Sequence, residues 1–569
     1  MARGGGLLWP VAAALACAAG TAILVVTLFT MWRLHVSLPY WDEWSSIIDL
    51  QLLEQGRYGL ADLAGQHNEH RILFPRLVFW ADARFFAMSG VLNLTVTVLL
   101  QMANAFILLA LVRGRTLRTV QLLLLAGFVV VLLFSLRQEQ NFTNGYQLQF
   151  VGVYTAAALA TVAYVRALER VDDRAGRSAP LFGLAALACG ISAYTMANGM
   201  LAGFVLTAIA ILRGSSRQII VTTVVLSSLL GAVYLHGYTP GDASFPLREV
   251  PSHLWAYPRY LTAYLGNPLG SNLRVTQALG VLGLILAAAA AWRVATLDRH
   301  DGGDLVLLGI MGFVLASAAL TSYGRVALGT EQASESRYAT PSLIFWCALV
   351  LFWFPVVFGQ DGPTTPTRSV STRVWPPALG ALMLLLAGAS VWFEASAWPD
   401  LASRSAALRH VSDSLISGLF DNEAASSYEN NSAADIANLV PHLRTHHLAA
   451  FADPAFALSG QVIDPAKEAS PCPGSVTVRA DPVLGTDGLR LAGTVPKQDS
   501  GPVTTRIVIA DSAARVAGFG SAALPGEPRR LWSGYARGRP GQELQAFASV
   551  GSDRYCALGH VTVEAQPPA

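Results

Sequence analysis

The stretch LLWPVAAALACAAGTAILVVTLFTMWRLHVSLPYWDEW, residues 7–44, decides the fold of this chain. Its apolar run, from Leu7 to Thr30, is longer than the roughly 20 residues that a helix needs to cross a bilayer. The run is also too long for the apolar region of a signal peptide, so we expect an uncleaved first span. Apolar runs recur as far as Ala395, and they predict a polytopic α-helical membrane protein.

The composition divides the chain into a membrane part and an ordinary mixed tail. Of the 569 residues, 53% are hydrophobic and only 13% are charged, whereas a soluble domain carries about 25% charged residues. We assign 1–395 to a transmembrane domain, 396–455 to a helical connector and 456–569 to a β-rich domain. The net charge of +2, without a basic stripe, gives no indication of nucleic-acid binding.

Eleven spans fit the apolar runs, and alternate connections between them are short and rich in arginine. The positive-inside rule places these connections and the N-terminus in the cytoplasm, in a plasma or inner membrane. Because eleven is odd, the β-rich domain is expected outside. Residues 180–196 and 200–212 can also be interpreted as one hairpin of short helices that meet at 197–199. The predicted spans are 8–31, 90–112, 119–136, 147–165, 180–196, 200–212, 218–236, 274–295, 305–322, 340–358 and 375–395.

The cysteines fall into two groups. Cys17, Cys189 and Cys347 lie in apolar runs and are expected to be inert packing residues. Cys472 and Cys556 form an isolated pair in the tail, which favours one disulfide in an oxidising compartment over two free thiols. Short β-rich runs between residues 475 and 564 predict a β-sandwich or jelly roll, whose first and last strands this disulfide would join.

The Trp41-Asp42-Glu43-Trp44 cluster follows the first span, at the start of the long outer loop 33–90. An interfacial aromatic belt explains Trp41 and Trp44, although both are also candidates for substrate contact. It does not explain two adjacent acids, which are costly beside a membrane unless they have a task. Asp42 or Glu43 is therefore expected to act as a general base, or to bind a divalent metal. The residues that follow, up to a stop at Gly56, have helical spacing.

A second cluster, Gln66-His67-Asn68-Glu69-His70-Arg71, lies further along the same loop. On a helix, His67, His70 and Arg71 would share one face. Histidine and Glu69 permit a metal site, but the spacing is not that of a zincin motif. Binding of an anionic substrate, with Arg71 at a phosphate, is the favoured interpretation. The next stretch, 71–88, is expected to be a helix along the membrane interface.

Three further clusters lie at the outer ends of predicted spans. Arg325 and Arg337, followed by Tyr338, suit a lipid-linked phosphate near the interface, with an ion-paired loop as the alternative. Arg259, among tyrosines, is either a sugar or phosphate clamp or an interfacial anchor. Asn141 belongs to an amide-rich run that would bind sugar hydroxyls or hold helices together.

The order of these features resembles the GT-C superfamily of membrane glycosyltransferases. The resemblance covers nearly the whole chain in architecture, but its motif is limited to Asp42-Glu43 in the first outer loop. It implies an inverting transfer of a sugar from a polyprenyl-phosphate donor to a cell-envelope glycan or glycolipid acceptor. Asp42 would be the base, although the adjacent Glu43 leaves the choice open. Arg337, Arg325, Arg259 and Arg71 would receive the carrier phosphate.

The same resemblance bears on the cofactor and on the sugar. Some relatives use a divalent cation, and no obligatory cofactor is expected here. The β-rich tail looks like the carbohydrate-binding modules of relatives that build arabinan-type glycans, which suggests a pentose such as arabinofuranose as the sugar. A transporter or flippase of a lipid-linked glycan is the alternative. It is disfavoured because the acids lie at the rim of the spans and not at mid-bilayer.

Overall fold

The computed structural model divides into two compact units, which we describe separately. Unit 1 comprises Met1–Arg33, Tyr58–Val78 and Asn93–Ala397, and unit 2 comprises Leu34–Arg57, Phe79–Leu92 and Trp398–Ala569. Two pieces of the loop after the first span therefore cluster with the C-terminal residues. The structure describes residues 8–113, 115, 117–172, 178–239, 245, 248–297, 301–359, 375–426, 433–463, 474–480, 487–495, 506–523, 530–549 and 555–564.

Within these residues, nine helical stretches are long and apolar enough to cross a membrane. This confirms the expectation of a polytopic helical membrane protein. Two further predicted spans coincide with shorter apolar helices, Ala179–Ala193 and Ala197–Leu212. The nine stretches are Leu8–Leu34, Val91–Val112, Thr119–Thr143, Gly145–Val171, Arg217–Leu235, Leu273–Ala295, Gly302–Leu328, Ser336–Phe358 and Trp375–Ser396.

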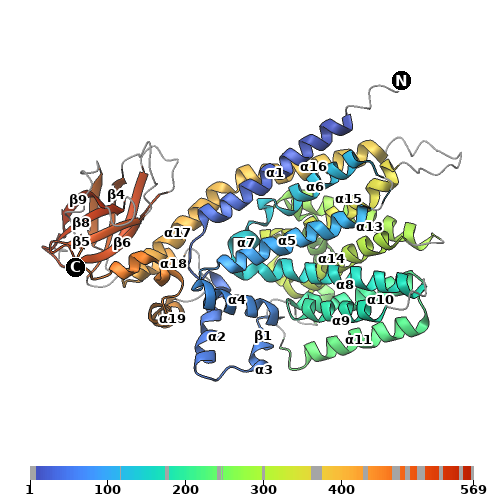
Figure 1. The fold of residues 1–569 in the computed structure, drawn as a ribbon, viewed down its shortest axis with the longest axis horizontal. Helices are drawn as coiled ribbons and strands as arrows, with labels where there is room; N and C mark the ends of the chain where they lie inside the picture. The colour runs from blue at the N-terminus through green and yellow to red at the C-terminus, as the bar shows by residue number, and fades with distance from the viewer. Residues whose placement is uncertain are drawn as a thin grey trace. The chain divides into compact units, whose positions relative to one another are not determined.

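The helices of unit 1 run side by side as a bundle (Figure 1). Helix α15 is deeply enclosed, since every residue from 339 to 352 is buried. The helices are α1 (Leu8–Leu34), α5 (Val91–Val112), α6 (Thr119–Leu133), α7 (Glu139–Thr143), α8 (Leu148–Asp172), α9 (Ala179–Ala193), α10 (Ala202–Leu212), α11 (Arg217–Leu235), α12 (Ala256–Leu265), α13 (Leu273–Ala295), α14 (Gly302–Arg325), α15 (Ala339–Phe358) and α16 (Trp375–Ser396).

The two short helices α9 and α10 meet through the 3-10 turn η4 (Ala197–Leu201). At Gly199 the backbone passes so close to α9 that a Cβ atom would lie 1.9 Å from the carbonyl oxygen of Ser192. Only glycine fits such an approach. The turn therefore forms where the sequence allowed a hairpin of short helices.

The loop 33–90 contains short elements. As expected, α2 (Ser45–Glu54) is helical, and the chain turns at Gly56 with φ +66°; α3 (Leu60–Leu63) and α4 (Leu73–Phe86) follow. His67–Arg71 do not form a helix, so the shared helical face that the sequence allowed for these residues is not present. Strands β1 (Gln66–His67) and β2 (His70–Arg71) form a hairpin instead, with Asn68 at φ 45° in its turn. Asparagine tolerates this left-handed conformation better than most residues, and it favours two-residue hairpin turns.

The β region of unit 2 is one antiparallel sheet of seven strands, in the order β3-β4-β7-β6-β5-β8-β9. The expected sandwich of two sheets is therefore not what forms. The edge strands β3 and β9 approach each other, so the sheet nearly closes into a barrel. Alternating sequence patterns do not distinguish these two solutions. The strands are β3 (Ser475–Ala480), β4 (Gly488–Val495), β5 (Arg506–Asp511), β6 (Val516–Ala522), β7 (Arg530–Arg537), β8 (Glu543–Ser549) and β9 (Tyr555–Thr562).

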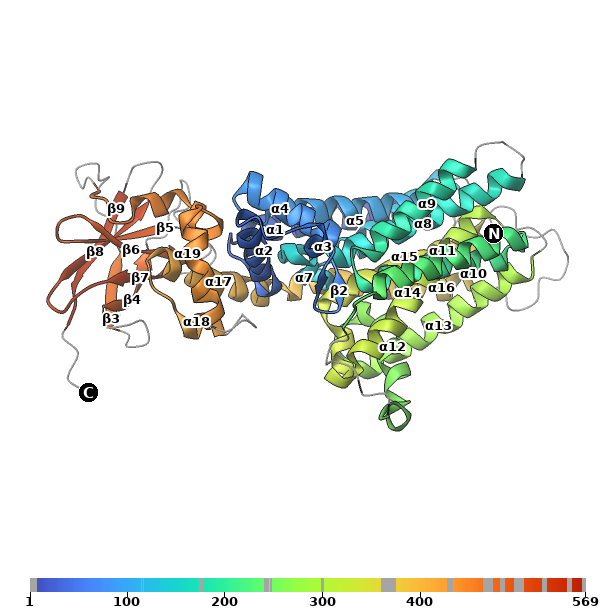
Figure 2. The same ribbon diagram turned by 90° about the horizontal axis from the view of Figure 1, so that it is seen from below.

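Helices cover one face of this sheet. Helix α17 (Trp398–Ile416) packs on β6 and β7, and α18 (Asn422–Ser426) and α19 (Ala433–Thr445) follow it (Figure 2). The 3-10 turns η11 (Ala449–Ala452) and η12 (Pro454–Leu458) lead back towards the strands. The apolar core between helices and sheet also contains Trp44 and Ile47 from the loop 33–90. Distant parts of the sequence thus build one core.

The predicted disulfide has one partner, Cys472, outside the described residues. Cys556 is buried on β9, and Gly474, next to β3, lies so close to Leu558 that a Cβ atom would be 2.8 Å from Cδ2 of that leucine. Gly474 lies two positions after Cys472 in the sequence, and Leu558 lies two positions after Cys556. In the described part, Cys17, Cys189 and Cys347 are free.

We therefore expect three maleimide labels on the denatured, unreduced chain and five after reduction, measured by intact mass. Five labels before reduction would contradict the disulfide.

Candidate functional site

The Trp41–Trp44 cluster forms a 3-10 turn, η1, in unit 2. The side chain of Glu43 accepts a hydrogen bond of 2.9 Å from the backbone N–H of Tyr40, and so it caps the turn. Asp42 is exposed. Of the two acids between which the sequence could not choose, Glu43 has a structural task and Asp42 faces solvent.

The two indoles of this cluster differ. Trp41 has a φ of 53° and stacks on Tyr40, with ring centroids 4.8 Å apart. A positive φ in a bulky residue costs of order 1–3 kcal/mol and persists only where the surroundings impose it. Trp44 is 2% exposed and belongs to the core with Ile47 and Leu415. Trp44 is therefore a packing residue, neither an interfacial anchor nor a surface for substrate.

In unit 1, the β1–β2 hairpin meets the end of α14. Glu69 accepts a 2.7 Å ion-pair hydrogen bond from Arg325, and both side chains are about three-quarters buried. The ring of His67 lies 5.4 Å from that of Tyr146. The second and third predicted clusters, far apart in the sequence, are thus brought together.

Arg71 has a different environment from the other candidate phosphate ligands. Its guanidinium donates to the carbonyl oxygens of Ala64 (3.0 Å), Tyr234 (2.9 Å) and His236 (2.7 Å). It also lies over the Tyr234 ring, 5.7 Å from the centroid. These contacts fasten the loop to the end of α11. Arg71 therefore holds the backbone that presents Glu69.

Arg337 and Tyr338 lie in the turn before α15. The guanidinium of Arg337 is 2.5 Å from the carboxylate of Glu335 and 5.3 Å from the ring centroid of Tyr338. Tyr338 is buried against Tyr264, whose ring centroid is 5.4 Å away. Arg259 is exposed on α12, away from this packing. The aromatic contacts fix the position of Arg337 within the turn.

The amide-rich run before α8 interlocks with the turns before α15. Asn141 donates to the carbonyl oxygen of Arg337 (3.0 Å) and to Thr340 (2.8 Å). Arg137 donates to the carbonyl oxygens of Asn267 (2.9 Å) and Ser334 (2.5 Å). The amide-rich run, the turns around Arg337 and the turn at Asn267 therefore form one continuous polar region inside an apolar bundle.

Several amide oxygens in unit 1 are buried and have no hydrogen-bond partner within the described part of the chain. An unsatisfied buried acceptor costs about 1–3 kcal/mol, and native proteins usually supply it with water or a ligand. Hydroxyl groups, such as those of a sugar, are the matching donors. The oxygens belong to Asn93, Gln140, Asn141, Gln147, Gln149, Asn198 and Asn267.

A hydroxyl network in unit 1 could not be predicted from the sequence. Tyr154 and Tyr264 share a 3.0 Å hydrogen bond, and Asn198 donates to Tyr154 (3.2 Å) and to Ser317 (3.0 Å). These residues come from α8, α12, η4 and α14. A tyrosine inside an apolar run looks like a packing residue, so only the fold reveals this network.

His70 lies within the fields of four charged or polar neighbours. Burial lowers its pKa from 6.5 to about 4; Glu69 opposes this shift, whereas Arg325, His67 and Arg337 reinforce it. The neutral ring accepts a hydrogen bond at Nδ1 from the backbone N–H of Ala197, 3.4 Å away. The interactions with Glu69, Arg325 and Arg337 indicate that the second and third clusters form one electrostatic site.

Because the pKa of His70 is lowered in the folded state, the unfolded chain binds the proton more readily between pH 6.5 and about 4. The contribution of neutral His70 to the stability of the fold is fully present above pH 6.5, and it is lost as the pH falls from 6.5 to about 4. We expect the thermal midpoint of wild type to fall over this window by more than that of His70→Gln. Equal pH dependence in the two proteins would contradict this assignment.

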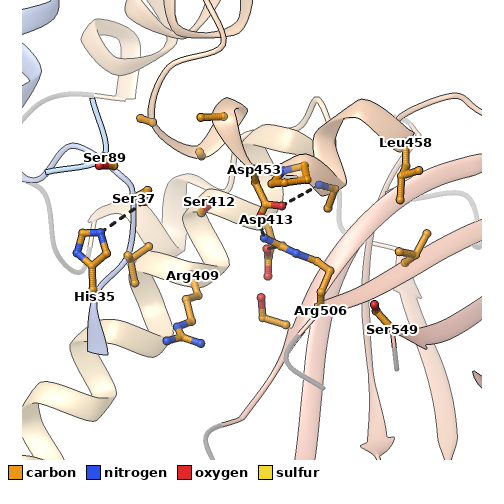
Figure 3. Close-up of a pocket in the computed structure, with 18 of the residues that line it drawn as sticks. His35, Ser37, Ser89, Arg409, Ser412, Asp413, Asp453, Leu458, Arg506 and Ser549 are labelled. Atoms are coloured by element: carbon orange, nitrogen blue, oxygen red, sulfur yellow. Dashed lines mark hydrogen bonds and ion pairs between the residues drawn. The ribbon is translucent and has the colours of Figure 1, made fainter. Parts of the chain in front are cut away.

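Unit 2 contains a polar cavity of about 860 Å³ that the sequence did not indicate (Figure 3). It is formed by the chain after α1, by α17, by η12 and by strands of the sheet. Arg506 bridges Asp413 and Asp453, with 2.5 Å to Asp413. The lining includes hydroxyl groups and further charges: His35, Ser37, Ser89, Arg409, Ser412, Ser521, Ser549 and Tyr555. Such a surface suits a polyhydroxylated ligand.

Comparisons of this chain with protein families, with curated proteins and with solved structures gave no match. The function is therefore inferred from the geometry of the site.

Proposed function

We propose that this protein is a membrane glycosyltransferase that moves a sugar from a polyprenyl-phosphate carrier to a glycan or glycolipid hydroxyl outside the cytoplasm. The supporting observation is the polar region of unit 1, where Glu69–Arg325, Glu335–Arg337 and Arg137 lie in a bundle of apolar helices. Charged groups in such a setting are costly and usually serve a substrate. A lipid-linked phosphate is the substrate that needs arginines beside a membrane.

The reaction is a direct displacement at the anomeric carbon. The base takes the proton of the acceptor hydroxyl, the acceptor oxygen bonds to the anomeric carbon, and the bond to the carrier phosphate breaks. Asp42 is the better candidate for the base, because Glu43 caps its own turn. The leaving group is polyprenyl phosphate, whose charge Arg325 and Arg337 would stabilise. A guanidinium carries five N–H donors, so each arginine can contact phosphate while keeping its carboxylate partner.

The orphan amide oxygens and the cavity of unit 2 suggest where sugars are recognised. In unit 1, the buried acceptor oxygens of Asn141 and Asn267 would accept hydrogen bonds from the hydroxyl groups of the donor sugar. The cavity belongs to the same unit as Asp42, and its serine and arginine side chains suit the acceptor glycan. A pentose such as arabinofuranose is the first donor sugar to examine. The proposal requires no cofactor.

The proposal is tested with the purified full-length protein in liposomes. Polyprenyl-phosphate donors carrying a pentose or a hexose are supplied with arabinan oligosaccharides or envelope glycolipids, and new glycosidic bonds are detected by mass spectrometry. We expect product only when donor, acceptor and protein are all present. Movement of the lipid-linked sugar across the bilayer without a new bond would overturn the proposal in favour of a flippase.

A further inference from the structure

Two histidines of α19 and one glutamate of α2 converge in unit 2. Oε2 of Glu54 lies 3.6 Å from Nε2 of His446 and 3.8 Å from Nδ1 of His442. The three ligand atoms all lie within 4.8 Å of one another. His442 and His446 are four positions apart, so a helical turn places them on the same face, and their ring centroids are 4.3 Å apart. The glutamate comes from a distant part of the sequence.

The hydrogen bonds of His446 fix which of its nitrogens faces Glu54. Nδ1 of His446 lies 3.0 Å from the carbonyl oxygen of His442. A carbonyl oxygen only accepts, so Nδ1 must carry the proton, and Nε2 of the neutral ring presents a lone pair towards the carboxylate. This arrangement, in which one ring nitrogen is bound to a backbone carbonyl, is what orients histidine ligands in metal sites.

His442 faces Glu54 through its other ring nitrogen. Its Nε2 is buried and has no hydrogen-bond partner in the described part of the chain, while Nδ1 is the nitrogen 3.8 Å from the carboxylate. Both spacings exceed the 2.7–3.2 Å or so of a hydrogen bond. They are close to the roughly 3.3 Å between two ligands of one tetrahedral ion with bonds of about 2.0–2.1 Å.

We propose that Glu54, His442 and His446 bind a divalent transition metal of the zinc class, which fastens α2 to α19. Two imidazoles and one carboxylate are a ligand set that zinc accepts, and the partial exposure of Glu54 and His446 leaves a fourth position for water. Calcium and magnesium prefer oxygen ligands and do not fit this set. The proposal is independent of the proposed glycosyl transfer.

The site is tested by titrating Zn²⁺ into the metal-stripped full-length protein in detergent, with affinity read by competition against a chelating dye. We expect one site, and at least a tenfold loss of affinity in His442→Ala, His446→Ala and Glu54→Gln. The matched control is His447→Ala, which removes the neighbouring histidine outside the cluster and should leave affinity unchanged. Co²⁺ in place of zinc should give the visible absorption of a four-coordinate ion in wild type only.

A thermal scan separates metal binding from a folding defect. In excess chelator, wild type and the three variants should have the same midpoint, and Zn²⁺ should raise that of wild type and His447→Ala only. The proposal is overturned if wild type binds no zinc, or if His447→Ala loses as much affinity as the three ligand variants. An unchanged affinity in all three ligand variants would also overturn it, since zinc would then bind elsewhere on the protein.

Discussion

Replacing Asp42 with Asn is expected to reduce glycosyl transfer by about 10²–10⁴-fold, because a positioned general base contributes about that much to the rate. The substitution keeps the size of the side chain and removes only its ability to take a proton. Asp42 is exposed, so no packing is lost. The measurement is initial product formation in liposomes at saturating donor.

Glu43→Gln is the matched control, since it makes the same chemical change one residue away. Glutamine still offers an oxygen to the N–H of Tyr40, so the cap survives and transfer should stay within about threefold of wild type. Wild-type rates in both variants would show that neither acid is the base. A severe loss in Glu43→Gln with normal activity in Asp42→Asn would transfer the role to Glu43.

Replacing Arg506 with Met is expected to destabilise unit 2 by about 3–5 kcal/mol, the usual cost of removing one partner of a buried ion pair. Asp413 is 1% exposed, and its charge would remain in the core without Arg506. Adding Asp413→Asn should recover part of the loss, because the buried charge is then removed as well. Amide hydrogen exchange of β5 and β6 in the full-length protein measures the change.

The matched control for Arg506 is Arg537→Met, again in the sheet. Arg537 pairs with Asp487 at 2.9 Å, but the two side chains are 53% and 40% exposed. Exposed pairs contribute about 0–1 kcal/mol, so the control should change exchange only slightly. If both variants lost similar protection from amide exchange, burial of the Arg506 pair would not determine how much that pair stabilises unit 2.

The sequence predicted the elements whose signal is local. Nine of the eleven predicted spans became helices long and apolar enough to cross a membrane, and the spacing from Trp44 to Gln55 became α2, because length and periodicity are properties of neighbouring residues. The same reasoning did not decide the conformation of His67–Arg71. Histidine and arginine fit a helix as well as a strand, and the turn conformation of Asn68 decided the outcome.

The candidate site was predicted in parts but not as a whole. Arg325 and Arg337 were chosen from their positions at the ends of spans and Glu69 from a polar cluster in the first long loop, and only the fold brings them together. The cavity around Arg506 gave no signal, because an arginine in a β-rich run normally looks like a solvated charge. Trp44 was misleading for the related reason that its core partners lie hundreds of residues later.

That separation has a consequence for how the protein is made. Trp44 and Ile47 complete a core whose other members, such as Val411 and Phe519, are synthesised last. At about 5–20 residues per second, the early segment waits for tens of seconds before its partners leave the ribosome. Throughout that interval two large apolar side chains need shelter, from the bilayer surface or from a chaperone. Early termination of translation would leave them exposed permanently, marking the product for degradation.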